Sequence, residues 1–174
     1  MTTQTGVTTA AVPAASHDTA RLYQEGIIAG VIGAATVAAW FLVLDAFAGR
    51  PLWTPTVLGS ALFRRGVPLG PLDAMPVSLE MVLMFTWVHC LVFAAIGGIA
   101  SRLLGLAERN PNVGFGVVLL FVVFEAGFTV AAMVFAEPVL HALTWPAVLV
   151  ANLLAAAAMV VYFRFRHPAL IVSP

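Results

Sequence analysis

Three polar side chains lie deep inside apolar stretches of this 174-residue chain, and their chemistry sets them apart from their neighbours. They are His89, Glu125 and Asn152. A carboxylate at the centre of a membrane helix costs about 3 kcal/mol on insertion scales, so it usually faces other helices and pairs with a polar group. Because the three residues fall at similar depths of three different stretches, we expect them to meet in one polar cluster.

The sequence leaves three interpretations of this cluster open. In the first, a protonated Glu125 donates a hydrogen bond to His89 or Asn152, and the cluster only fixes how the helices pack. In the second, His89 and Glu125 relay protons or ions. In the third, His89 alone is the axial ligand of a haem or chlorophyll, although nothing in the sequence requires a cofactor. No second histidine lies at a matching depth to complete an axial pair.

A second group of ligand-type residues lies near the ends of the apolar stretches: Asp45, Glu137 and His141. Pro138 favours a helix start, and the i, i+4 spacing then places Glu137 and His141 on one face. Carboxylate and imidazole groups both bind divalent metals, so these three residues form a candidate metal site. The alternative is that Asp45 pairs with Arg50 and that the other two are solvated.

Common catalytic motifs are missing from the sequence. It contains neither H-E-x-x-H, nor G-x-S-x-G, nor a glycine-rich phosphate loop. The single cysteine, Cys90, excludes an internal disulfide framework and a cysteine-rich metal site. Acid–base catalysis by Glu125 and His89 stays open, but the sequence favours a non-catalytic protein.

The composition places the chain in a lipid bilayer. Hydrophobic residues make up 61% and charged residues only 9%, whereas a soluble domain carries about 25% charged residues. The mean hydropathy is +1.02. A formal net charge of zero excludes a nucleic-acid-binding protein, which needs a basic surface to neutralise phosphates.

Four apolar stretches are long enough to cross the roughly 30 Å hydrocarbon core as helices. They cover about residues 26–47, 79–100, 113–135 and 145–163. None alternates between apolar and polar residues as a membrane β-strand does. We therefore expect an all-α integral membrane protein, a four-transmembrane-helix bundle in residues 21–167, with a disordered N-terminal tail (1–20) and a C-terminal tail (168–174).

The arginines predict the orientation of this bundle. An even number of spans places both termini on one side, and five of the eight arginines fall on that side. These five are Arg21, Arg102, Arg109, Arg164 and Arg166, while the other side holds Arg50, Arg64 and Arg65. The positive-inside rule then predicts cytoplasmic N- and C-termini for a multi-pass protein of a bacterial plasma (inner) membrane.

The first outer loop, about residues 48–78, contains a second helix signal. Thr54 followed by Pro55 is typical of a helix N-cap and first turn. The apolar residues that follow form one stripe: Val57, Leu58, Ala61 and Leu62. We expect a short interfacial helix that lies on the outer membrane surface.

Small residues predict where the helices meet. Membrane helices associate by close van der Waals approach, which small side chains permit. The first stretch carries a seam of such residues: Gly26, Gly30, Gly33, Ala34 and Ala38. This seam either holds the bundle together or faces another subunit.

These patterns favour one function and leave two others open. The favoured function is a non-catalytic accessory or assembly subunit of a membrane complex, whose partners are the lipid bilayer and other membrane subunits or a second copy of the chain. The first alternative is a proton-coupled or ion transporter that uses Glu125 and His89. The second is a cofactor-binding subunit with His89 as the axial ligand.

Overall fold

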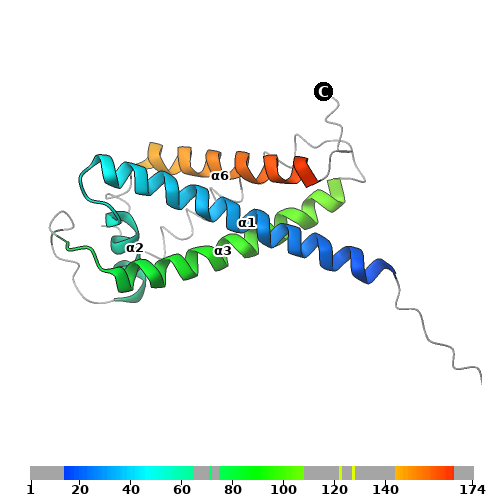
Figure 1. Ribbon diagram of the computed structural model, residues 1–174, viewed down its shortest axis with the longest axis horizontal. Coiled ribbons are helices and arrows are strands. Elements are labelled where there is room, and N and C mark those ends of the chain that lie inside the picture. Colours follow the sequence, from blue (N-terminus) through cyan, green and yellow to red (C-terminus); the bar gives the residue numbers. More distant parts are fainter. Residues whose placement is uncertain are drawn as a thin grey trace, which may run out of the picture.

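The structure is a computed structural model that describes residues 14–64, 71, 75–107, 122, 127 and 144–166. The regular structure of this part of the chain is entirely α-helical. Its helices are α1 (Ala14–Phe47), α2 (Trp53–Phe63), α3 (Leu79–Ala107) and α6 (Trp145–Arg166) (Figure 1).

Three of these helices are long and apolar enough to cross a membrane. The candidate spans are Ala20–Phe47 in α1, Leu79–Arg102 in α3 and Trp145–Arg166 in α6. The shortest has 22 residues, which at 1.5 Å per residue gives about 33 Å, the thickness of the hydrocarbon core. The structure therefore confirms an all-helical fold in the described residues and three helices long and apolar enough to span a membrane. Apart from residues 122 and 127, the expected span over residues 113–135 lies outside the described residues.

All three long helices extend beyond the predicted spans on the side rich in arginine. α1 begins at Ala14, inside the stretch 1–20 that the sequence predicts as a tail. The residues just before the predicted span include Arg21, Gln24 and Glu25, which have high helix propensity, so the helix includes this polar stretch. α3 continues through leucines to Ala107, and α6 continues to Arg166.

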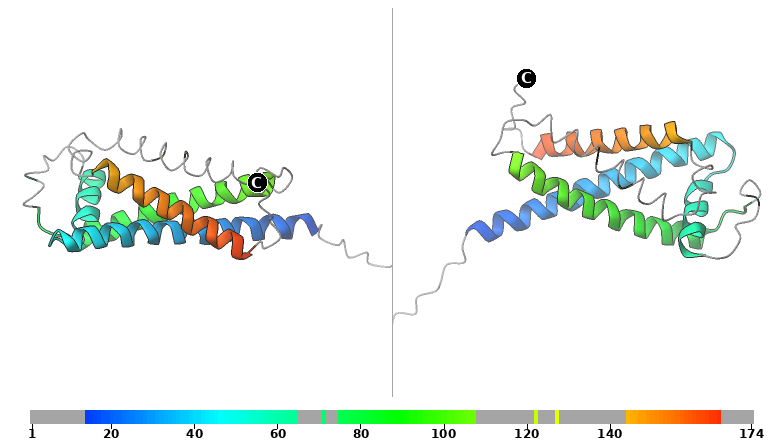
Figure 2. Two further views of the ribbon diagram at one scale, coloured as in Figure 1. Left: turned by 90° about the horizontal axis from the view of Figure 1, so that it is seen from above. Right: turned by 180° about the vertical axis from the view of Figure 1, so that it is seen from behind.

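Helix α1 is the central helix of the described bundle. It crosses α3 and also runs beside α6, while α2 lies across the end at which α1 stops and α3 begins (Figures 1 and 2). The indole N–H of Trp40 in α1 donates a 3.0 Å hydrogen bond to the carbonyl oxygen of Ala147, in the first turn of α6. The beginning of α6 therefore lies at the same end of the bundle as α2.

The crossing of α1 and α3 depends on three glycines. A Cβ placed on Gly26 would lie 2.5 Å from the carbonyl oxygen of Gly97, and a Cβ on Gly30 would overlap the carbonyl of Phe93. In the reverse direction, a Cβ on Gly97 would overlap the carbonyl of Gly26. The two backbones are therefore in direct contact, which is the close approach that small residues allow in membranes.

A small core forms where α6 joins this crossing. Gly33 of α1 faces the sulfur of Met159 and the ring of Phe93, and both of those side chains are buried. The other buried members of this cluster are Ala29, Ala34, Ala100, Ala155, Ala156 and Phe163. The cluster thus combines five alanines with the larger side chains of Phe93, Met159 and Phe163.

Helix α2 begins two residues earlier than its sequence signal indicates. Leu52 is the N-cap residue, in the left-handed region with φ of 66°, and Thr54 lies inside the first turn. The helix packs on α3 through Gly59, where a Cβ would overlap the carbonyl of Met81. The backbone N–H of Ser78, just before α3, donates a 3.3 Å hydrogen bond to the Thr56 hydroxyl. Its interfacial position in a membrane stays a prediction.

Candidate functional site

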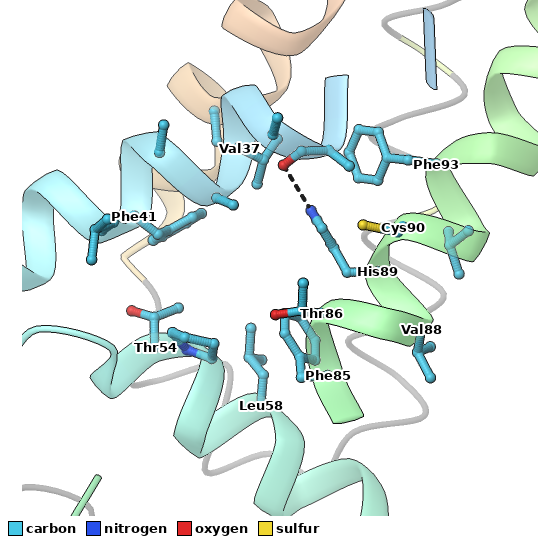
Figure 3. A pocket seen from close by; sticks show the side chains of 18 of the residues that line it. Val37, Phe41, Thr54, Leu58, Phe85, Thr86, Val88, His89, Cys90 and Phe93 are labelled. Carbon is cyan, nitrogen blue, oxygen red and sulfur yellow. Dashed lines mark hydrogen bonds between the residues drawn. The ribbon is translucent and has the colours of Figure 1, made fainter. Parts of the chain in front are cut away.

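A cavity of about 720 Å³ lies between α1, α2, α3 and α6 (Figure 3). Apolar side chains form most of its wall, including Phe41, Leu58 and Phe85. The polar side chains at the wall are those of Thr54, Thr86, His89 and Asn152. Its volume lies within the range of about 300–1,000 Å³ that is typical of small-molecule sites.

His89 is the titratable imidazole at the cavity wall, and contacts with α3 and α1 fix its position. Its Nε2 atom lies 3.3 Å from the carbonyl oxygen of Ala34 in α1, the contact drawn as a dashed line in Figure 3. Its ring packs between those of Phe85 and Phe93, one helical turn away on either side, with ring centroids 5.5 and 4.7 Å apart. When Nε2 donates to a carbonyl, a neutral imidazole keeps its lone pair on Nδ1.

This geometry bears on the cofactor interpretation of His89. Axial ligation through Nε2 requires that the imidazole release the Ala34 carbonyl. Cys90, the next residue, also lines the cavity and is a free thiol.

Two of the three residues in the predicted polar cluster line this one cavity. Asn152 is buried on α6, and His89 reaches the same space from α3. The third residue, Glu125, lies outside the described residues. The structure therefore places His89 and Asn152 at the wall of one cavity, as the sequence predicts. The proton relay stays a prediction.

Asp45, from the predicted metal group, has a structural role at the junction of two helices. Its side chain is only 6% exposed. Oδ2 accepts a 2.7 Å hydrogen bond from the backbone N–H of Thr54, and Oδ1 accepts one of 2.7 Å from the Thr54 hydroxyl. Asp45 thus links the last turn of α1 to the first turn of α2, where free backbone N–H groups need acceptors.

The rest of the predicted metal group is not placed by the structure. Glu137 and His141 lie outside the described residues. Within the described part of the chain, no three His, Cys, Asp or Glu side chains lie close enough to hold a metal ion. Arg50, the alternative partner of Asp45, has its guanidinium 4.4 Å from the ring centre of Trp53, and its backbone N–H donates to the Asp45 carbonyl.

The small-residue seam is largely used within the chain. Gly26, Gly30, Gly33 and Ala34 are buried against α3 and α6. Ala38 is exposed and lines the cavity instead. Most of the seam is therefore covered within the chain and is not available to another subunit.

The outer face of α3 carries an exposed apolar surface. A stripe of exposed apolar side chains recurs every fourth residue: Leu83 (70% exposed), Trp87 (68%) and Leu91 (53%). We call this set the α3 stripe. The spacing of four residues aligns them along one side of the helix.

Two bonds that join distant segments were not anticipated from the sequence. One is the bond from Trp40 to Ala147, and the other is the 2.8 Å ion pair between Glu25 of α1 and Arg166 of α6. An indole N–H inside an apolar helix does signal the need for an acceptor. Its identity depends on which helix packs alongside, and the local pattern does not contain that information.

Comparison of the chain with protein-family models, curated proteins and solved structures gives no match.

Proposed function

We propose that the chain is a small multi-pass membrane protein that acts as a non-catalytic accessory or assembly subunit of a membrane complex. The observation that carries this proposal is the α3 stripe. Trp87 lies eight residues after Leu79, the first residue of its span, or about 12 Å along the helix. Tryptophan that faces lipid prefers the membrane–water interface, whereas buried tryptophan is common at the centre of protein interfaces.

The use of the polar groups also supports a non-catalytic role. Asp45 holds α2 against α1, Trp40 binds the first turn of α6, and His89 contacts the backbone of α1. Within the described part of the chain, every buried side-chain nitrogen or oxygen has a hydrogen-bond partner. These bonds place the helices relative to one another.

The proposal includes the full membrane topology. Residues 113–135 form the fourth span of a four-helix bundle, α2 lies at the outer interface, and both termini face the cytoplasm of a bacterial cell. Two observations support this topology. Gly127 borders the central cavity, and Arg21, Arg102, Arg164 and Arg166 come from the same end of the three described spans.

Site-specific photocrosslinking tests the proposed interface. Cys90 is the only cysteine, so Cys90→Ala gives a background in which Trp87→Cys carries a single benzophenone label. Leu153→Cys is the matched control, because Leu153 is 58% exposed on α6 and also lies eight residues after the start of its span. In native membranes we expect one adduct of defined mass from position 87 and none from position 153.

The same experiment distinguishes the other outcomes. An adduct at twice the mass of the chain identifies a second copy as the partner. Lipid adducts alone at both positions would contradict the accessory-subunit proposal.

A second candidate function is proton-coupled or ion transport. The observation that favours it is that His89 and Asn152 border one cavity of about 720 Å³. Flux in proteoliposomes tests this alternative: transport predicts pH-dependent flux that Glu125→Gln and His89→Gln abolish. Flux that is present but unchanged in both variants would remove these residues from the mechanism, and a lack of flux under all gradients would count against transport.

A further inference from the structure

The cavity between α1, α2, α3 and α6 is open along one face of α1. Residues of this face line the cavity and are also exposed, among them Val31, Ala35, Ala38 and Leu42. Their spacing of three or four residues is that of a single helix face. They all lie inside the candidate membrane span Ala20–Phe47. A molecule dissolved in the bilayer therefore reaches the cavity from the side of α1.

The wall of the cavity suits an apolar molecule that contains a ring. Phe41 of α1 and the pair Phe85 and Phe93 of α3 contribute aromatic side chains to it (Figure 3). Cavities with apolar walls stay dry and bind apolar molecules. Aromatic rings also attract one another in stacked or edge-to-face pairs, beyond the effect of the area that they bury.

Two polar side chains of α3 at this wall have their hydrogen-bond donors already occupied. The Thr86 hydroxyl donates a 2.7 Å bond to the carbonyl oxygen of Val82. The Nε2 atom of His89 contacts the carbonyl oxygen of Ala34, and because a carbonyl only accepts, this nitrogen is the donor. The groups that remain are acceptors, namely the lone pairs of the Thr86 oxygen and of Nδ1 of His89.

The same is true of a third polar side chain on the other side of the cavity. Thr54 of α2 lines it, and its hydroxyl donates to Asp45. The fourth, Asn152, is buried and has an interaction of its own. Thr86 and His89 lie three residues apart and therefore on one side of α3, where Figure 3 shows both at the cavity. A ligand that bonds to this pair has to bring the donor itself.

We propose that the cavity binds a membrane-soluble phenol, an apolar molecule with a hydroxyl group on an aromatic ring. The hydroxyl donates to the acceptors of Thr86 and His89, the ring packs against the phenylalanines of the wall, and the rest of the molecule lies toward the open face of α1. A ketone or quinone of the same size would bring only acceptors to these two residues. None of the residues of the α3 stripe lines the cavity, so this site is tested separately from the accessory role.

Photolabelling of the purified full chain in detergent tests the proposal. The probe is a para-alkylphenol with a diazirine in its alkyl chain, and the matched control is the methyl ether of the same probe, which has no donor. Mass spectrometry of the peptides locates the label. We expect the phenol to label the cavity wall about fivefold more than the ether does, the effect of one hydrogen bond. An excess of para-octylphenol is expected to suppress this labelling more strongly than its methyl ether does.

Substitutions identify the acceptors. Thr86→Val removes the hydroxyl with little change of shape and is expected to reduce the preference for the phenol over the ether, and His89→Phe in the same chain to abolish it. Thr36→Val is the control, because the Thr36 hydroxyl makes a similar bond, 2.8 Å to the carbonyl oxygen of Ile32, but does not line the cavity.

Four results would overturn the proposal. They are equal labelling by phenol and ether, label outside the cavity wall, a preference that survives in the double variant, and a Thr36→Val variant as damaging as Thr86→Val. The comparison of phenol with ether needs no substitution, so it decides the proposal even if the double variant fails to fold.

Discussion

Asp45 and Thr54 form a two-point link between the end of α1 and the beginning of α2. Both carboxylate oxygens accept hydrogen bonds from Thr54, one from its backbone N–H and one from its hydroxyl, each 2.7 Å long. The residues between them make a tight turn in which Gly49 and Leu52 both have positive φ. A left-handed leucine costs of order 1 kcal/mol, so the link with Asp45 helps to hold a backbone that is otherwise unfavourable.

Replacing Asp45 is therefore expected to destabilise the protein. Asp45→Ala removes both acceptors and leaves the N–H of Thr54 buried without its partner, at a cost of about 1–3 kcal/mol. Thr54→Ser keeps both bonds and is the control with little effect. Thermal unfolding in detergent measures the difference. A loss of stability on chelation of divalent metals, absent in Asp45→Ala, would instead favour the metal site predicted from the sequence.

The close crossing of α1 and α3 can be tested by comparing substitutions at two adjacent glycines, Gly97 and Gly98. Gly97→Ala places a Cβ into the backbone of α1 and is expected to cost about 1–3 kcal/mol or more. Gly98→Ala is the matched control, since its Cβ would meet only the Tyr23 ring at 4.0 Å, an ordinary contact. The thermal midpoints of the two variants should differ by several degrees. Equal midpoints would show that the helices do not cross at Gly97.

Loss of the hydrogen bond between Trp40 and Ala147 is expected to destabilise the protein less than Gly97→Ala does. Trp40→Phe removes the indole donor and is expected to cost about 0.5–1.5 kcal/mol. Trp87→Phe changes the same residue type on the exposed face of α3 and should leave the midpoint of the isolated protein unchanged. If both variants unfold at the wild-type temperature, the packing of α6 on α1 does not depend on this bond.

The surroundings of His89 predict the optical spectrum of the protein. Because Nε2 contacts the Ala34 carbonyl and the ring packs between two phenylalanines, we expect no haem or chlorophyll band between about 350 and 800 nm in protein purified from its native membrane. A band in this range that His89→Gln removes would establish the axial-ligand interpretation instead.

The sequence predicts the long helices well because composition alone determines them. The starts of α3 at Leu79 and α6 at Trp145 match the first residues of their apolar stretches. The ends on the arginine side extend further than predicted, since arginine, glutamate, glutamine, leucine and alanine in these extensions favour helix. Composition gives no such guide to α2, whose first residue depends on the turn at Leu52.

The candidate site could be predicted only in part, because its contacts join residues distant in sequence. His89 and Asn152 lie at similar depths within their stretches, and both border the same cavity. The partner of His89 is the backbone carbonyl of Ala34, 55 residues away, and no sequence pattern indicates this contact. Asp45 resembles a metal ligand by residue type, yet the turn that follows it supplies its hydrogen-bond donors.

Copurification in a mild detergent tests the central claim most directly. If the chain is an accessory subunit that docks through the α3 stripe, the wild-type protein will copurify with a partner subunit in a fixed ratio. Trp87→Ala will then lose this partner, while Leu153→Ala will keep it. A chain that purifies alone from its native membrane, or that keeps the same partner in Trp87→Ala, would contradict the account.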